Sequence, residues 1–320
     1  MPRVVHVKTI YTVRPITYSE PRLSHGKSQR EPNQTVMLSG MKFGLFVPPF
    51  YALADPERLV SIGVDAEEAG WDGLFLWDHM LAGDGTPIAD PWITMAGIAC
   101  ATTRIRLGAM VTPLSRRRPW VMARQIATLD LLSRGRLVVG VGLGDDGWQE
   151  FSGFGEVVDA RARGRLLDQS LALLQQLLTG RPTVLDEGDI RVSTSPFLPL
   201  PIQQPLPLWA AGRWPRRRPL ERAAKVQGFF PIFPPATARQ PPEQAELLEI
   251  HRELEQRGAD DGFDLVVTWP FSTGVQAGVT SATVERMDEA GVTWILQGFE
   301  PTPSALEGVA AAVRRGPPGR

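Results

Sequence analysis

Eight short apolar runs alternate with eight longer segments that have the spacing of amphipathic helices, and this alternation restricts the fold more than any other feature. The apolar runs are Phe43–Val47, Gly73–Trp77, Ile105–Thr112, Leu137–Gly142, Leu208–Ala211, Gly228–Ile232, Phe263–Trp269 and Thr293–Gln297. The helical segments span residues 56–69, 91–102, 119–132, 160–178, 219–225, 243–257, 282–290 and 305–314. Strands that alternate with helices are typical of a parallel sheet, and eight such units favour a closed (β/α)8 TIM barrel.

A doubly wound open sheet is the alternative α/β architecture. Such a sheet normally carries the pattern G-x-G-x-x-G directly after its first strand. Here Val47 is followed by Pro48, Pro49 and Phe50 instead, so the barrel is the preferred interpretation.

The first 40 residues differ from the rest of the chain. They are polar, interrupted by proline and without periodicity, and they hold six basic residues against two acidic ones. We expect residues 1–40 to be a disordered extension or the product of a misassigned start codon, with Met41 or Met37 as the true start; a basic targeting arm is the alternative. Residues 41–320 then form a single domain, with the proline-rich residues 181–207 as an insertion between barrel units four and five.

Composition argues against several classes of partner. The 34 Lys and Arg residues nearly balance the 35 Asp and Glu residues, and a net charge of −1 does not favour nucleic acid. No apolar run approaches the ~18 residues of a membrane helix, and the first 40 residues lack the apolar core of a secretory signal. The single Cys100 excludes an intramolecular disulfide and fits a reducing compartment, so we expect a cytoplasmic location.

Asp78 and His79 directly follow the second apolar run, where the catalytic loops of a barrel begin. A histidine next to a carboxylate is the best general acid or base candidate in the chain, and we expect Asp78 to orient His79. A histidine that only bonds a neighbouring strand is the alternative. The other three histidines are not at strand ends, so no metal site is expected. None of the four lysines lies at a strand end either, which argues against a Schiff-base lyase or aldolase.

Two further patterns lie at the same rim. Gly140, Gly142 and Gly144 alternate at the end of the fourth run, and they would allow the backbone to approach a flat ligand or a phosphate; a tight turn is the alternative. The tetrapeptide Arg-Arg-Arg-Pro occurs at residues 116–119 and again at 216–219, each time before a helix. These clusters, together with Arg213, would attract an anionic ligand; arginines that are solvated or paired with acids are the alternative.

Six segments together resemble the bacterial luciferase-like family of flavin- and deazaflavin-dependent oxidoreductases. They are MKFGLFVPPF from Met41, AEEAGWDGLFLWDH from Ala66, ADPW from Ala89, TTRIRLGAMVTPLSRRRPW from Thr102, ATLDLLSRGRLVVGVGLG from Ala127 and LWAAGRWPRRRPLERAA from Leu208. The resemblance is dense from Met41 to about Phe233. It implies a (β/α)8 barrel and a cofactor ring bound at the C-terminal mouth.

The resemblance also implies roles for individual residues. A non-proline cis peptide bond between Met110 and Val111 would form a bulge behind the ring, and Asp78 and His79 would contact the ring or transfer protons. The remaining cofactor-binding positions, along the ring, the ribityl chain and the phosphate, would be Gly142, Leu143, Gly144, Ala211, Gly212 and Arg213. Luciferase has an arginine where this chain has Leu143, and Arg213 or one arginine cluster would take over its contact with phosphate.

The family uses two cofactors, and the sequence leaves both open. An FMN enzyme would be a monooxygenase acting on a small organic molecule, with reduced flavin from a separate reductase. An F420 enzyme would be a dehydrogenase or reductase that exchanges a hydride without oxygen, and a non-catalytic flavin-binding protein is a third possibility. The arginine clusters suit the anionic tail of F420, and relatives are often homodimers.

Overall fold

The computed structural model describes residues 40–83, 85–188, 190–233, 242–260, 262–269 and 281–318. The expectation of an extension or misassigned start over residues 1–40 therefore falls outside the described residues, which begin at Gly40. The described residues lie in one compact unit, Val36–Arg320.

Parallel strands form the centre of this unit and confirm the barrel. In chain order they are β1 (Lys42–Val47), β2 (Gly73–Leu76), β3 (Arg106–Ala109), β4 (Thr112–Pro113), β5 (Val139–Gly142), β8 (Leu208–Arg213), β9 (Gly228–Ile232), β10 (Asp264–Trp269) and β11 (Trp294–Gly298). Their order in the sheet is β3-β2-β1-β11-β10-β9-β8-β5-β4. The barrel closes between β3 and the residues just before β5. Leu107 in β3 pairs in parallel with Leu137, and its carbonyl accepts a 2.9 Å hydrogen bond from the Val138 amide.

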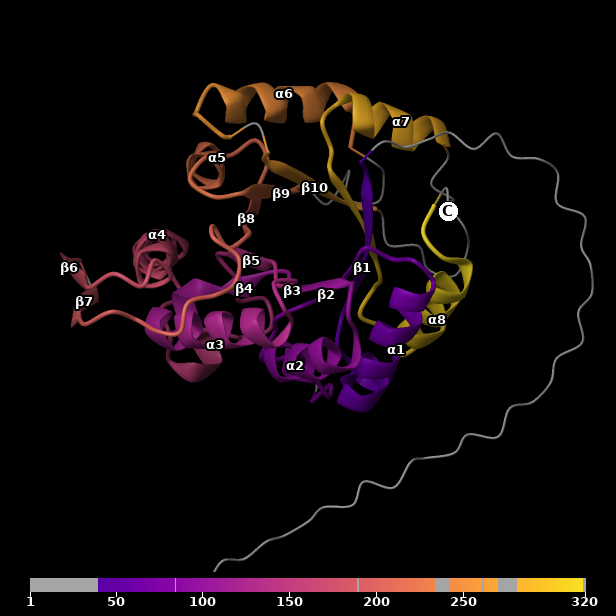
Figure 1. The fold of residues 1–320 in the computed structure, drawn as a ribbon, viewed down its shortest axis with the longest axis horizontal. Helices are drawn as coiled ribbons and strands as arrows, with labels where there is room; N and C mark the ends of the chain where they lie inside the picture. The colour runs from indigo at the N-terminus through magenta and orange to yellow at the C-terminus, as the bar shows by residue number, and fades with distance from the viewer. Residues whose placement is uncertain are drawn as a thin grey trace, which may run out of the picture. The chain divides into compact units, whose positions relative to one another are not determined.

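Eight helices surround the strands (Figure 1). They are α1 (Pro56–Glu68), α2 (Pro91–Ala101), α3 (Pro119–Leu132), α4 (Ala160–Leu177), α5 (Arg217–Ala223), α6 (Gln244–Glu255), α7 (Ser281–Glu289) and α8 (Ala305–Arg315). Proline occupies the first position of α1, α2 and α3, where its missing amide costs no helical hydrogen bond. Asp55 and Asp90 cap α1 and α2 through their side-chain oxygens. All eight predicted helices are confirmed within about two residues.

Two features depart from the regular alternation. The third predicted strand is divided into β3 and β4, and the peptide bond between Met110 and Val111 at the break is cis, as the resemblance implies. Residues 181–207, expected to be an insertion, contain an antiparallel hairpin of β6 (Thr183–Glu187) and β7 (Ile190–Thr194) that pairs with no barrel strand. The hairpin lies beside α4 (Figure 1). That this region is an insertion relative to other barrels stays a prediction.

Large aromatic side chains fill the inside of the barrel. Trp209, Trp294 and Phe75 are fully buried there, with ring centroids 5.4–5.6 Å apart. Trp209 also donates a 3.1 Å hydrogen bond to Asp264. A second apolar layer joins the strands to the helices. Among the described residues, no helix combines the length and apolar character needed to cross a bilayer.

Candidate active site

Three of the predicted cofactor-binding segments meet where β3 passes into β4 and at the C-terminal ends of β5 and β8. A β-carbon added to Gly142 would lie 2.4 Å from the Val111 side chain and 3.8 Å from that of Ala211. The Val111 side chain therefore packs tightly against the backbone of Gly142 at the end of β5. The three segments are therefore packed against one another.

The glycines at the end of β5 have a packing role that needs no ligand. A β-carbon on Gly140 would lie 2.3 Å from the Met110 sulfur, and one on Gly144 would lie 2.8 Å from the Phe151 ring. Gly144 also has a positive φ of 73°, which favours glycine. The glycines thus make room for neighbouring protein groups, and contact of Gly142, Leu143 and Gly144 with a cofactor stays a prediction.

Glu150, in the loop between β5 and α4, orients His79. Its carboxylate lies 2.8 Å from Nδ1 of His79. The expectation that Asp78 orients this histidine is therefore wrong. A ring nitrogen that donates to a carboxylate carries the proton, so His79 is left with Nε2 as its reactive atom. Nε2 has no hydrogen-bond partner in the part of the chain that the structure describes, and the side chain is 25% exposed.

Glu150 is buried and held by several donors. It accepts hydrogen bonds from the Met80 and Leu81 amides, and it lies 3.3 Å from the Arg116 guanidinium. Burial acts to raise the pKa of Glu150. The hydrogen bond and charge of His79, with the Met80 amide and Arg116, outweigh that effect and hold the pKa below its ordinary value. Glu150 is therefore an ionised partner for His79.

Asp78 faces away from His79 and into a buried network of its own. Its carboxylate accepts hydrogen bonds from Trp92 (3.2 Å), Thr112 (2.9 Å) and Arg117 (2.8 Å). Arg116 lies 3.3 Å from Asp78 and 3.3 Å from Glu150, so it joins the two carboxylates. The negative charges of Asp78 and Glu150 are thus matched by the positive charges of Arg116 and Arg117.

This network corrects the expectation for the first arginine cluster. The side chains of Arg116 and Arg117 are only 5% and 19% exposed and are paired with Asp78. Arg118 lies over the Trp120 ring at 5.8 Å. The alternative of arginines paired with acids therefore holds for Arg116 and Arg117.

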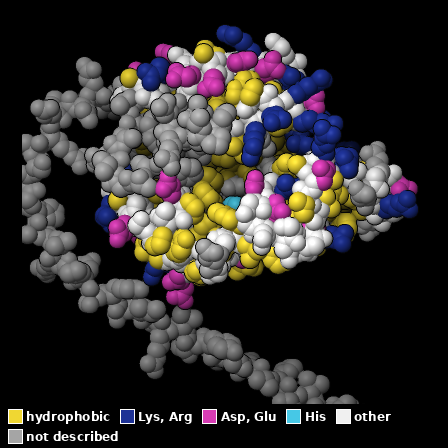
Figure 2. Space-filling model, turned by 180° about the vertical axis from the view of Figure 1, so that it is seen from behind, with side chains coloured by type: hydrophobic (Ala, Val, Ile, Leu, Met, Phe, Trp, Pro, Cys, Tyr) yellow, Lys and Arg dark blue, Asp and Glu magenta, His cyan; other side chains and the backbone are white. Residues whose placement is uncertain are grey.

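The second arginine cluster remains at the surface. Arg213, Arg217 and Arg218 are 73%, 83% and 72% exposed and lie 3.9, 2.7 and 3.5 Å from Asp145, Glu221 and Asp168. Arg216 is exposed and has no ion pair with any other described residue. Figure 2 shows Lys and Arg side chains gathered on one side of a hollow. We call Arg213, Arg216, Arg217 and Arg218 the arginine rim; these four exposed arginines outnumber the three acids that they face.

Aromatic rings surround His79. The ring centroids of Trp148, Phe50 and Trp77 lie 4.9, 5.7 and 5.7 Å from that of His79. Yellow hydrophobic side chains line the hollow in Figure 2, and a histidine is visible within it. The sequence analysis missed Glu150, because its partner His79 is 71 residues away in the chain. The only local signal is an acid in a loop after a strand end.

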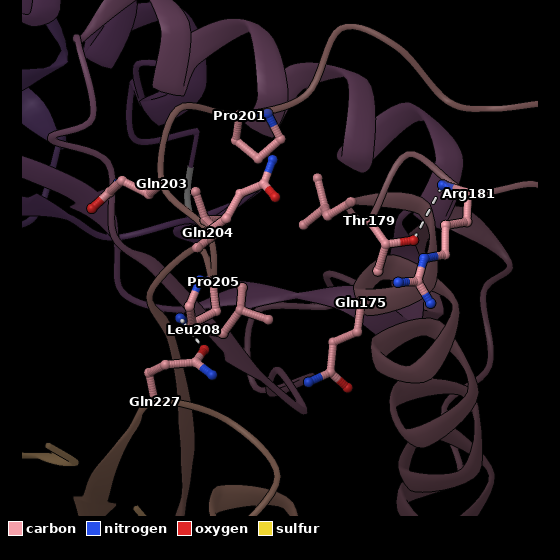
Figure 3. A pocket seen from close by; sticks show the side chains of 11 residues that line it. Gln175, Thr179, Arg181, Pro201, Gln203, Gln204, Pro205, Leu208 and Gln227 are labelled. Carbon is pink, nitrogen blue, oxygen red and sulfur yellow. Dashed lines mark hydrogen bonds between the residues drawn. The ribbon is translucent and has the colours of Figure 1, made fainter.

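A groove of about 440 Å³ lies at the opposite end of the barrel (Figure 3). It is lined by Leu208 at the start of β8, Gln227 just before β9 and Gln175 near the end of α4. Its amides are used inside the protein: Gln203 donates to Asp130 and Leu137, and Gln175 donates to the Lys225 carbonyl. We assign this groove a structural role.

Replacing Glu150 with glutamine is expected to lower the free energy of unfolding by about 2 kcal/mol at neutral pH, because Arg116 and His79 lose a charged acceptor. The pKa of Glu150 is depressed, so its contribution is complete above the ordinary value of about 4.5 and is lost as the pH falls through the folded pKa. The difference in the free energy of unfolding between wild type and Glu150→Gln should therefore become smaller as the pH falls below about 4.5. Urea unfolding across a pH series measures it.

The matched control is Glu255→Gln, because Glu255 pairs with His251 on the exposed face of α6. That variant is expected to change stability by less than about 0.5 kcal/mol. Equal losses of unfolding free energy in the two variants would show that Glu150 stabilises the protein no more than an exposed glutamate does.

Comparison with known proteins agrees with this architecture. The family model described as luciferase-like monooxygenase matches residues 41–286. An F420-dependent glucose-6-phosphate dehydrogenase from Beutenbergia cavernae is 33% identical over 157 residues, 46% of each chain. The same enzyme from Rhodococcus hoagii is 36% identical over 153 residues, 45% of this chain and 43% of the other. The chain thus matches a little less than half the length of these curated relatives.

Solved structures share the fold at low identity. An F420-dependent secondary alcohol dehydrogenase in complex with an F420–acetone adduct has a TM-score of 0.67 at 17% identity, covering 87% of this chain and 98% of the other. The monooxygenase RslO1 from Streptomyces bottropensis has a TM-score of 0.61 at 21% identity, covering 86% and 80%. At these identities the likeness concerns the fold alone.

Proposed function

The chain belongs to the luciferase-like monooxygenase family, and we propose that within this family it is an F420-dependent dehydrogenase or reductase of a small organic molecule. The sequence alone leaves this reading open beside that of a flavin monooxygenase. The names of the curated relatives support it, since they are F420-dependent dehydrogenases. The observation that carries the proposal is a histidine held through Nδ1 by a buried carboxylate, whose Nε2 has no hydrogen-bond partner among the described residues.

In this proposal, the residues at the mouth of the barrel have different roles. His79 takes a proton from a substrate hydroxyl through Nε2, or returns it to a carbonyl, and Glu150 holds the ring in position. Asp78 is a positioning residue that anchors Arg116 and Arg117 beneath them. Coenzyme F420, when bound, accepts or supplies the hydride that balances this proton.

The chain offers a surface that suits this coenzyme. Met110 and Val111 would back its flat ring, and Gly142, Leu143, Gly144, Ala211 and Gly212 would line it. The tail of F420 carries a phosphate and several glutamates, so it needs more cationic groups than the single phosphate of FMN. The arginine rim supplies them, because Arg216 has no ion pair among the described residues and its neighbours are only partly neutralised at the surface.

Replacing Arg216, Arg217 and Arg218 together with alanine is expected to raise the Kd for F420 at least about tenfold. The Kd for FMN should change by less than about threefold, since FMN has one phosphate at most to lose contact with. Isothermal titration with each cofactor measures both.

The matched control for this triple variant is Arg314→Ala/Arg315→Ala, at the exposed end of α8. It should leave both affinities unchanged. An unchanged Kd for F420 in the triple variant would sink the proposed role of the arginine rim.

The expectation of a homodimer stays a prediction. The dimer interface would be formed by exposed apolar side chains on α2 and α3, namely Ile93, Trp120, Val121, Leu131 and Leu132. A separate flavin reductase would be needed only if FMN were the cofactor.

A further inference from the structure

The segment between β5 and α4, which carries Glu150, is held in the protein by two adjacent side chains. Of the residues between Leu143 and Asp159, all of which the structure describes, only Glu150 and Phe151 are buried. Because the two residues are consecutive and closely packed, a displacement of the Phe151 ring also displaces Glu150. The contacts of Phe151 therefore help to decide where the partner of His79 lies.

Arg163, near the start of α4, anchors Phe151. Its guanidinium lies over the Phe151 ring, 4.4 Å from the centroid, and its Nη1 donates a 3.3 Å hydrogen bond to the Gly144 carbonyl. Asp159 caps α4 by accepting from the Ala162 amide, which fixes the turn that carries Arg163. A planar guanidinium can cover a ring and donate a hydrogen bond at the same time. One side chain of α4 thus holds both the start of the segment and its buried ring.

Burial of Arg163 is not explained by an ion pair within the described part of the chain. The residue is only 7% exposed, and its Nε has no hydrogen-bond partner among the described residues. The acid one turn further along α4, Asp168, pairs with Arg222 and Arg218 instead. An apolar side chain would fill this space at a lower cost in desolvation. It could not, however, reproduce the hydrogen bond and the cation–ring contact that the guanidinium makes.

The Phe151 ring also contacts an arginine that pairs with Glu150. The Arg116 guanidinium lies over the ring at 5.7 Å from the centroid, and its Nη1 is 3.3 Å from the Glu150 carboxylate. Asp146 ties the segment together, because it accepts hydrogen bonds from the Phe151 and Ser152 amides at 2.8 and 3.0 Å. A displaced Phe151 ring would therefore disturb Glu150 both through the backbone and through Arg116.

We propose that Arg163 is a positioning residue: through Phe151 it holds Glu150 against Nδ1 of His79, and it thereby keeps the proton of the neutral imidazole on Nδ1. Nε2 is then the unprotonated nitrogen of the ring. The consequence for proton transfer rests on the proposed function, whereas the effect of Arg163 on the His79 ring does not depend on it.

The test is heteronuclear NMR of the imidazole nitrogens in the full chain, without cofactor or substrate, at a pH where the histidines are neutral. His79→Ala identifies the signals of His79. The form with the proton on Nδ1 is expected to predominate in wild type, and in Arg163→Met its fraction should fall at least about twofold. The matched control is Arg165→Met, which removes an exposed arginine from the same helix and should leave the fraction unchanged. An unchanged fraction in Arg163→Met would overturn the proposal.

A second variant keeps the proposal testable if circular dichroism shows that Arg163→Met does not fold. Phe151→Leu removes the ring beneath the guanidinium but keeps an apolar side chain, and it is expected to lower the fraction protonated on Nδ1 as well. A wild-type fraction in Phe151→Leu would contradict the role of the ring. If F420 fails to bind to the wild-type protein, the proposed function fails, while the NMR result still decides whether Arg163 positions Glu150 and His79.

Discussion

Replacing His79 with alanine is expected to reduce turnover with F420 by about 10²- to 10⁴-fold, the usual contribution of a positioned acid or base. The affinity for F420 should stay within about threefold of wild type, since the loss of one imidazole contact removes little binding energy. Steady-state kinetics and a cofactor titration on the same preparation measure the two effects. The separation of turnover from binding is what distinguishes a catalytic histidine from a structural one.

His251→Ala is the matched control for this experiment. His251 also pairs with a glutamate, at 3.1 Å, but on the exposed face of α6. Its loss should leave turnover unchanged. The double variant His79→Ala/Glu150→Gln is expected to be no slower than His79→Ala alone, because Glu150 acts through the histidine. If His79→Ala keeps turnover within a few-fold of wild type, the histidine is structural and another group must transfer the proton.

Replacing Asp78 with alanine is expected to lower the free energy of unfolding by about 3–5 kcal/mol, because two buried arginines lose their partner. Arg117 contacts Asp78 at 2.8 Å and Arg116 contacts it at 3.3 Å, and the aspartate also accepts from Trp92 and Thr112. Urea unfolding monitored by circular dichroism measures the loss. Adding Arg117→Met should recover part of it, since one unpaired buried charge is then removed.

The control for Asp78 is Asp186→Ala. Asp186 pairs with Arg191 at 3.0 Å, but both side chains are largely exposed in the β6–β7 hairpin. Its loss should cost less than about 1 kcal/mol. A loss for Asp78→Ala that is no greater than that for Asp186→Ala would show that the buried network does not stabilise the mouth.

The barrel could be predicted from the sequence because its signals are local. Proline after Asp55 and Asp90 marks the start of a helix, and the apolar strands are short and regularly spaced. The cis bond at Met110–Val111 came from the resemblance, not from the residues themselves. The β6–β7 hairpin was not predicted, since residues 181–207 combine several prolines with weak periodicity.

The site was only partly predictable, because side-chain partners depend on distant segments. Asp78 and His79 are adjacent, which suggested a pair, yet consecutive residues at a strand end point in different directions. His79 turns to Glu150 and Asp78 turns to Arg116 and Arg117. The two arginine clusters are identical in sequence but differ in burial, because only the first has a buried acid beside it.

The most direct test of the central claim is a thermal-shift series on the full chain with F420, FMN and reduced FMN. A ligand at about 100 times its Kd adds about 2.7 kcal/mol to stability, which is an easily measured shift. We expect F420 to stabilise the protein clearly and both forms of FMN to do so weakly or not at all. Stabilisation by reduced FMN alone would contradict the assignment of F420 as the cofactor and would favour an oxygen-dependent monooxygenase.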